Sequence, residues 1–312
     1  MNNDLSSYFE DPEFKEALEK YEGMVKNHTP AYFDADELTD IAEYYASKGR
    51  QIEAEAAIDF ALQLHPNDTD ALIFRARSLA MKGRLDEAYM VMDLIEDRSD
   101  REVRFLKADL LMEEKRMEEA DHVFEELAAY EEGKLETLID IILAYIDANQ
   151  EALAKKWIKH VGETYDLASL SQKNQKFRDL LCDFYITFNN PEAAIPLLQA
   201  TLDCYPYSIN HWNSLGKCYL STNDYEEAHE AIDFALAIDD SNAEALTLKA
   251  FCYQQSGELQ KSCDYYLRLA EQQENKTRAY LALAKTYFEM QDYTSSIYYI
   301  EALLDNKDAL SK

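Results

Sequence analysis

The chain has 312 residues and a net charge of −30, from 61 acidic and 31 basic residues. A surface of that sign repels a phosphate backbone, which argues against nucleic acid and anionic membranes as partners. With seven glycines, six prolines and a hydrophobic share of 47%, the composition favours a folded helical protein over disorder.

The cysteines and the hydropathy pattern bound the class of protein further. The five cysteines include no Cys-x-x-Cys pair and are odd in number, which predicts reduced thiols rather than a zinc site or a disulfide framework. Residues 1–11 lack the pattern of a signal peptide, and no uncharged apolar run approaches the roughly 18 residues of a membrane span. We therefore expect a cytoplasmic protein without metal or cofactor.

An N-terminal segment, residues 1–34, is predicted to contain one helix over residues 11–27. Asp11 is the expected N-cap, and Pro12 suits the first helical position. One face of this helix carries Phe14, Ala17, Leu18, Tyr21, Met24 and Val25. We expect that face to cover the element that follows, which opens with the capping-box pattern of Asp34 and Glu37.

From residue 35 to residue 312 the chain repeats itself with a period of about 34 residues. The eight repeats begin near Ala35, Thr69, Arg101, Leu135, Gln175, Ile209, Ala243 and Thr277. Repeat position 20 is small in all eight repeats: Ala54, Ala88, Ala120, Ala154, Ala194, Ala228, Ser262 and Ser296. Position 8 is small in every repeat except the fourth, where it is Ile142.

This pattern predicts a helix hairpin in each repeat. Positions 4, 7, 8 and 11 follow the i, i+3, i+4, i+7 spacing of one helix face. Position 15 is Gly or Asn in six repeats, and both residue types tolerate the left-handed conformation that ends a helix. The small residues at positions 8 and 20 let the two helices approach closely. Because one hairpin cannot bury its apolar face alone, the hairpins must stack on one another.

Two places depart from the regular array. The step from the fourth to the fifth repeat is 40 residues, which places an insertion around residues 165–174. We interpret it as a surface insertion, accommodated by a longer loop or longer helices, with a hinge or binding loop as the alternative. The last hairpin offers an apolar edge without a polar capping helix, formed by Ile297, Tyr298, Ile300, Leu303 and Leu304. Such an edge predicts an end-to-end homodimer.

One segment carries a known signature. Trp212, Leu215, Gly216, Tyr219 and Ala228 follow the pattern Trp-x2-Leu-Gly-x2-Tyr…Ala. The same order and spacing recur upstream in Leu38, Ile41, Ala42, Tyr45, Ala54, Ile58, Ala61 and Pro66. The chain therefore resembles the tetratricopeptide-repeat (TPR) family. This resemblance implies an all-α, right-handed α–α superhelical solenoid of about eight hairpins with an extra N-terminal helix.

The resemblance also implies where a partner binds. In TPR proteins the first helices line a concave surface that binds peptides, and repeat positions 2, 5, 9 and 12 face it. In repeats two to four these positions supply an apolar set, which is Ile73, Phe105, Met112, Ile139, Leu143 and Ile146. An amphipathic helix or an extended peptide would suit this set. We interpret the acidity of the chain as solvated helix faces that keep it soluble, with a basic partner as the alternative. The alternative is that a neighbouring helix or the insertion covers it.

Repeats six to eight supply a more polar set, which is Asn210, Asn213, Lys217, Arg278 and Lys285. One TPR subclass grips a carboxy-terminal carboxylate with Lys and Asn at positions 5 and 9 and with further Asn and basic residues. Here Asn213 and Lys217 stand in reversed order, and Leu248 and Ala282 replace two of the polar residues. Only Arg278 fits that clamp well.

No catalytic constellation is recognisable. The glycines form no phosphate-binding loop, and the six histidines form no His-x-x-x-His pair. Adjacent carboxylates are frequent and carry little information about acid–base catalysis. We therefore predict a non-enzymatic adaptor or scaffold that binds a peptide or protein segment in its groove. The alternative is a self-associating structural protein, and the charge disfavours an RNA-binding helical repeat.

Overall fold

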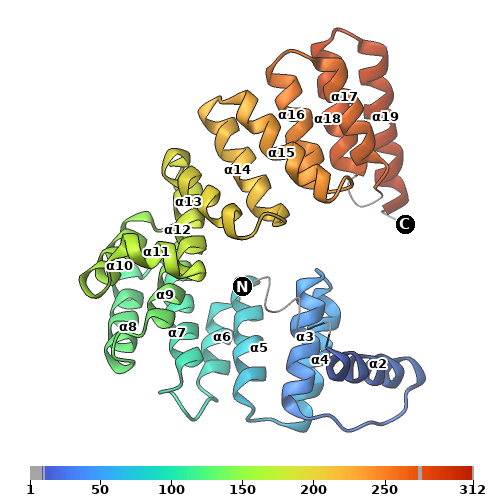
Figure 1. Ribbon diagram of the computed structural model, residues 1–312. Coiled ribbons are helices and arrows are strands. Elements are labelled where there is room, and N and C mark those ends of the chain that lie inside the picture. The colour runs from blue at the N-terminus through green and yellow to red at the C-terminus, as the bar shows by residue number, and fades with distance from the viewer. Residues whose placement is uncertain (1–8, 10, 273–275, 311–312) are drawn as a thin grey trace. The chain divides into compact units, whose positions relative to one another are not determined.

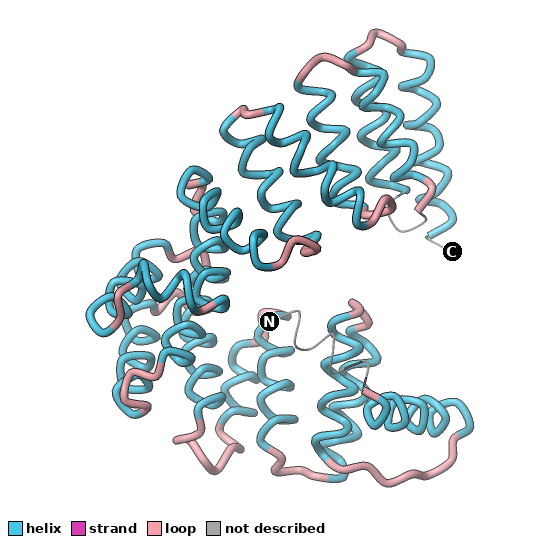
Figure 2. Tube along the Cα trace, in the orientation of Figure 1, coloured by secondary structure: helices cyan, strands magenta, loops and turns pink. Residues whose placement is uncertain are grey.

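The computed structural model describes Phe9, residues 11–272 and residues 276–310. Helices are the only regular elements in this part of the chain, and short turns join most of them (Figures 1 and 2). The all-α prediction is confirmed. The chain divides into two compact units, Met1–Thr137 (unit 1) and Leu138–Lys312 (unit 2). The division falls inside α9 (Leu135–Asp147).

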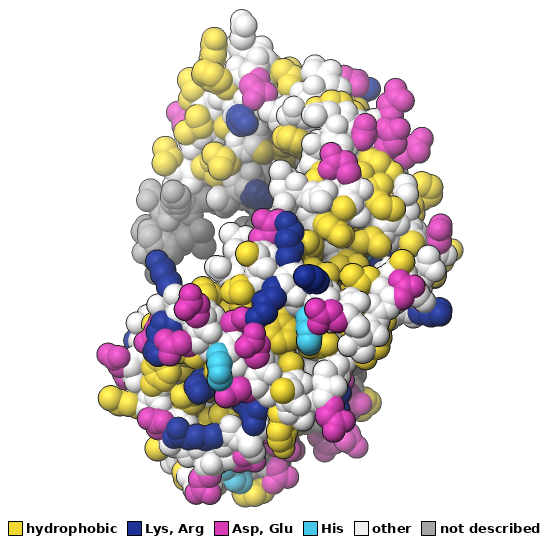
Figure 3. Space-filling model, turned by 90° about the vertical axis from the view of Figure 1, so that its left-hand side faces the viewer, with side chains coloured by type: hydrophobic (Ala, Val, Ile, Leu, Met, Phe, Trp, Pro, Cys, Tyr) yellow, Lys and Arg dark blue, Asp and Glu magenta, His cyan; other side chains and the backbone are white. Residues whose placement is uncertain are grey.

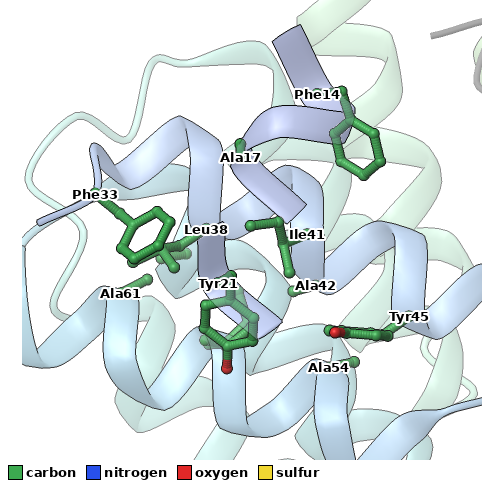
Figure 4. Packing of buried hydrophobic residues seen from close by; sticks show 13 residues of the cluster. Phe14, Ala17, Tyr21, Phe33, Leu38, Ile41, Ala42, Tyr45, Ala54 and Ala61 are labelled. Atoms are coloured by element: carbon green, nitrogen blue, oxygen red, sulfur yellow. The ribbon is translucent and has the colours of Figure 1, made fainter. Parts of the chain in front are cut away.

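Unit 1 begins with α2 (Pro12–Asn27) and continues as helix hairpins. These hairpins are α3 (Ala35–Ser47) with α4 (Gln51–Leu64), α5 (Thr69–Met81) with α6 (Leu85–Met92), and α7 (Arg101–Glu113) with α8 (Met117–Tyr130). In Figure 4, side chains of α2 lie against those of α3, with Phe14, Ala17 and Tyr21 buried. Val25 in the last turn of α2 was expected on this face but is 53% exposed. The Asp34–Glu37 capping box is confirmed, since Glu37 Oε2 accepts from Asp34 N at 2.9 Å.

Unit 2 contains α10 (Glu151–Thr164), a short helix α11 (Leu167–Lys173) and further hairpins. The hairpins are α12 (Gln175–Thr187) with α13 (Pro191–Cys204), α14 (Ile209–Thr222) with α15 (Tyr225–Ile238), α16 (Ala243–Gln255) with α17 (Leu259–Ala270), and α18 (Lys276–Glu289) with α19 (Tyr293–Leu310). Seven of the eight first helices start at the residue predicted as repeat position 1, while α18 starts at Lys276 rather than Thr277.

The turn inside each hairpin has one backbone conformation throughout. Position 15 lies in the left-handed region in all eight repeats, with φ of 72° at Gly49 and 65° at Asn223. Lys115 and Gln291 adopt it too, with φ of 63° and 62°, although neither is Gly or Asn. The next backbone N–H closes the turn by donating to the carbonyl of position 11, as Arg116 N does to Leu111 O at 2.9 Å. This hydrogen bond satisfies a helix-end carbonyl and offsets the cost of the conformation.

Small side chains stand where the two helices of a hairpin cross. Position 20 is buried in every repeat, with 0% exposure at Ala54, Ala120 and Ala228. At position 8 of α14, a carbon-β added to Gly216 would lie 2.7 Å from Cγ1 of Ile232. The close approach of α14 and α15 therefore requires a small residue at position 8 of this repeat.

The predicted insertion forms α11 rather than a longer loop or longer helices, so that expectation is wrong. Asp166 starts this helix by accepting from Ala168 N at 3.2 Å. The buried Arg178 guanidinium then donates to the carbonyls of Ser171 and Gln172 at 3.0 and 3.2 Å, near the end of α11. Arg178 Nε also donates to Thr201 Oγ1 at 2.7 Å, so one side chain ties α11 to α12 and α13.

Candidate functional site

The apolar set predicted to line a groove is mostly buried. Ile73, Phe105 and Met112 in unit 1 are 4%, 7% and 9% exposed. The ring of Phe105 packs against that of Phe124 with centroids 5.3 Å apart. In unit 2, Ile139 and Ile146 are buried and Leu143 is half-buried. A partner has little access to these side chains in this conformation.

The reason is that these side chains pack against other helices of the array. Ile73, at position 5 of α5, belongs to one buried cluster with Val103 and Leu106 of α7 in the next repeat. Phe105, at position 5 of α7, packs on Phe124 of α8 in its own hairpin. The apolar character of these two side chains is therefore explained by packing within the protein.

Part of the polar set in repeats six to eight also contacts the repeat that follows. Asn213 is 1% exposed, and its Nδ2 donates to Asn242 Oδ1 at 3.1 Å and to Glu244 Oε2 at 3.2 Å. Lys217 forms an ion pair with Glu244. Lys285 Nζ lies 4.0 Å from Glu289 on its own helix, whereas Asn210 and Arg278 are exposed. Asn213 and Lys217 thus join α14 to α16, and the carboxylate-clamp arrangement does not form.

Charged residues occupy positions 2 and 9 of the first helices of unit 1. These positions are Asp36 and Glu43 on α3, Asp70 and Arg77 on α5, and Glu102 and Asp109 on α7. We call the five carboxylates the acidic row. The sixth residue, Arg77, is positively charged. Its Nη2 lies 3.5 Å from Glu102 Oε2, and its Nε lies 3.6 Å from Asp109 Oδ2.

The acidic row holds carboxyl groups that ionise less readily than usual. Burial raises the pKa of Asp109 to about 6, although the nearby Arg77 guanidinium opposes this shift. Burial, followed by the charge of neighbouring acids, also raises the pKa of Glu43 and of Asp70. Carboxyl groups with such shifts are candidates for a functional site, because a cation bound beside them would stabilise their ionised forms.

A pocket of about 480 Å³ lies in unit 2 between α13, α14 and α15. Its aromatic residues are Trp212, Tyr219 and Phe234, and its charged residues are Asp203, Glu227 and Glu230. The rings of Trp212 and Phe234 are stacked, with centroids 4.6 Å apart and an interplanar angle of 18°. Leu215 and Gln199 also line the pocket, and none of the lining residues is basic. We call this the Trp212 pocket.

Sequence reasoning missed both features, although each left a signal. The acidic row is visible as an acid at position 2 in the first three repeats and at position 9 in the first and third repeats. The leucine at position 7 of the sixth repeat is a weak signal for the Trp212 pocket, because position 7 is apolar in four other repeats as well. The face shown in Figure 3 mixes acidic, basic and hydrophobic side chains, so net charge alone does not mark a site.

Metal and membrane features can be stated for the described residues. Among them, no group of three or more His, Cys, Asp or Glu side chains is arranged to hold a metal ion. No helix in this part of the chain combines the length and apolarity that crossing a bilayer requires. All five cysteines are free thiols, and only Cys204 is exposed.

Helix hairpins that recur at a fixed interval, with small residues where their helices cross, define an α-helical repeat protein. A sequence model described as tetratricopeptide repeat matches residues 39–89, 183–243 and 213–276. The chain belongs to the tetratricopeptide-repeat family.

Comparison with known proteins adds more distant likenesses. The formate-dependent nitrite reductase complex subunit NrfG of Escherichia coli O157:H7 is 26% identical over 178 residues, which cover 55% of this chain and 83% of NrfG. A tetratricopeptide repeat protein from Parabacteroides merdae ATCC 43184 is 16% identical with a TM-score of 0.50, covering 81% of this chain and 98% of that one. The APC/C hetero-tetramer Cut9–Hcn1 contributes a chain that is 17% identical with a TM-score of 0.50, covering 90% of this chain and 48% of that one. At these identities the two structures indicate the fold alone.

Proposed function

We propose that this chain is a non-enzymatic adaptor that binds a basic segment of another protein along the acidic row of unit 1. The observation that carries the proposal is the raised pKa of Asp109, Asp70 and Glu43 on neighbouring first helices. Lysine or arginine side chains placed among these carboxylates would stabilise their ionised forms. NrfG is a subunit of a nitrite reductase complex and Cut9–Hcn1 is a hetero-tetramer, which supports a protein partner.

The spacing of the helices suggests the form of the segment. Axes of packed helices lie about 8–10 Å apart. An extended chain advances about 3.3 Å per residue, so every third residue would meet the next helix. A peptide with lysine at every third position would therefore place one ammonium group at each of α3, α5 and α7.

Isothermal titration calorimetry with such a peptide tests the proposal. The variant Asp70→Asn/Asp109→Asn should weaken binding by about tenfold at physiological ionic strength. The matched control Glu16→Gln/Glu19→Gln removes two exposed carboxylates from α2 and should leave the affinity nearly unchanged. Because the pKa of Asp109 is about 6, binding to the wild type at pH 6 should release protons into the buffer. Equal weakening in the control, or no proton release, would overturn the proposal.

A second candidate function is self-association through the last hairpin. Ile297, Ile300 and Leu304 on α19 are 55%, 46% and 59% exposed, and their spacing places them on one helix face. Tyr298 is 63% exposed and Leu303 is half-buried. Leu281 and Phe288 of α18, which are 65% and 62% exposed, add apolar surface to this hairpin, and a second copy would bury it. Light scattering that shows a strict monomer at high concentration would remove this candidate.

A further inference from the structure

Consecutive repeats are joined in two places by a basic residue at position 7. Lys249 at position 7 of α16 pairs with Asp233 at position 25 of the preceding repeat, with Nζ 2.6 Å from Oδ1. Arg75 at position 7 of α5 pairs in the same way with Asp59. The chain thus shows twice how a basic side chain of a first helix reaches the second helix of the preceding repeat.

The surroundings of Lys249 show what such a side chain needs. It is 3% exposed, its Nζ also donates to the carbonyl of His229 at 3.3 Å, and it lies 5.6 Å from the ring centroid of Tyr253. A carboxylate, a backbone carbonyl and an aromatic ring therefore replace the water that the ammonium group loses.

The sixth repeat has neither the basic residue nor the aspartate that pairs with it, but it keeps the aromatic ring. Position 7 of α14 is Leu215, and position 25 of the preceding repeat is Gln199. Tyr219 stands at position 11, as Tyr253 does in the next repeat. Leu215, Gln199 and Tyr219 all line the Trp212 pocket. The pocket therefore lies at the place that Lys249 fills one repeat later.

The remaining wall residues are suited to a cation. Trp212 Nε1 donates to the carbonyl of Pro206 at 2.7 Å, which fixes the indole ring. Phe234 is stacked on that indole, and its own side chain is 54% exposed. The faces of such rings attract ammonium and guanidinium groups. Carboxylates of Asp203, Glu227 and Glu230 stand at the same pocket, so an anion would be repelled.

We propose that the Trp212 pocket receives a lysine or arginine side chain from a basic segment of a partner protein. The guest side chain takes the place that corresponds to Lys249 in the next repeat. Its aliphatic stem packs on Leu215, and its charged group faces the aromatic rings on one side and the pocket carboxylates on the other. This inference goes beyond the proposed function, because the pocket residues all belong to unit 2 and the acidic row belongs to unit 1.

Fluorescence of Trp212 tests the proposal directly. The probe is the peptide with lysine at every third position, and its counterpart has every ε-amine acetylated. The lysine peptide should change the tryptophan emission of the wild type, whereas the acetylated peptide should not. Trp212→Phe should remove the response, because the other tryptophan, Trp157, is 2% exposed.

Two variants locate the guest. Glu227→Gln/Glu230→Gln should raise the Kd measured by emission by about tenfold. The matched control is Glu192→Gln/Glu226→Gln, which removes exposed acids of α13 and α15 that do not line the pocket. It should change the Kd by less than about twofold. Gln199→Asp/Leu215→Lys recreates the Asp233–Lys249 pair inside the pocket and should abolish the response.

The outcomes separate the two proposed sites. Asp70→Asn/Asp109→Asn should leave the emission response in place, since those residues lie in unit 1. If the matched control weakens the response as much as Glu227→Gln/Glu230→Gln does, the acidity of the whole surface and not the pocket binds the peptide. An equal response to the acetylated peptide, or in folded Gln199→Asp/Leu215→Lys, would also overturn the proposal. If that variant does not fold, the surface pair Glu227→Gln/Glu230→Gln decides.

Discussion

Lys249 Nζ lies 2.6 Å from Asp233 Oδ1, with the lysine side chain 3% exposed and the aspartate side chain 61% exposed. The ammonium group is thus taken out of water while its partner remains at the surface. The interaction links α16 to α15 across a repeat boundary, where most other contacts are apolar. A buried charge of this kind specifies which helices meet, and it destabilises the fold when its partner is removed.

Asp233→Asn should lower the free energy of unfolding by about 1 to 3 kcal/mol, because it leaves the Lys249 ammonium without its carboxylate. Lys249→Leu copies Leu215 of the preceding repeat and should be much less harmful, since replacing a buried ion pair with apolar packing is often neutral. Urea denaturation followed by circular dichroism measures both. The interpretation fails if Lys249→Leu is the more destabilising of the two.

Gly216→Ala should destabilise the α14–α15 hairpin by about 1 to 3 kcal/mol through overpacking. The added carbon-β would meet Ile232 Cγ1 at 2.7 Å, where the neighbour is a branched side chain in the core. Gly23→Ala is the matched control, because nothing lies within 4 Å of a carbon-β at that position of α2. The control should stabilise the protein by about 0.5 to 1 kcal/mol through helix propensity. Thermal melting of the two variants should therefore shift in opposite directions.

The stability of the protein should depend on pH through Asp109. Its folded pKa of about 6 lies above the ordinary value of 3.8, so the folded state binds more protons between these two pH values. The free energy of unfolding contributed by this group therefore falls as pH rises from about 4 to about 6, and stays low above that. Asp109→Asn removes this pH dependence. The Tm of the variant should therefore exceed that of the wild type most near pH 7.5, and the difference should vanish near pH 4.

Asp97→Asn provides a control of opposite sign. The Ser99 hydroxyl and backbone N–H lower the pKa of Asp97, so its carboxylate stabilises the folded state at neutral pH and loses this effect in acid. The variant should lower the Tm at pH 7.5, and this effect should shrink as the pH falls below the ordinary Asp pKa value of 3.8. A Tm difference for Asp109→Asn that is independent of pH would contradict the assignment.

The sequence predicted the hairpins because their physics is local. Ala54, Ala120 and Ala228 are small because another helix of the same hairpin crosses there. Asn223 suits the left-handed turn between the two helices. Residues of both kinds recur at a fixed interval, so periodicity alone identifies them. What Asn213 contacts depends on the next hairpin, and no pattern within one repeat contains that information. The resemblance assigned Asn213 and Phe105 to a groove, whereas Asn213 joins two repeats and Phe105 packs on Phe124 of its own hairpin. The Trp212 pocket was hidden for the same reason, because it becomes visible when Leu215 is compared with Lys249 in the structure.

Thiol labelling should divide the cysteines into one reactive group and four protected ones. Cys204 is exposed at the end of α13, while Cys182, Cys218, Cys252 and Cys263 are buried. Burial raises the pKa of the Cys182 thiol to about 12 and those of the other three to about 11, so little reactive thiolate forms at neutral pH. Mass spectrometry after alkylation at pH 7.5 should find one modified residue in the native protein and all five in denaturant. Rapid native labelling of Cys218 would contradict the closeness of the α14–α15 packing, because its sulfur belongs to the same apolar cluster as Leu215 and Ala231.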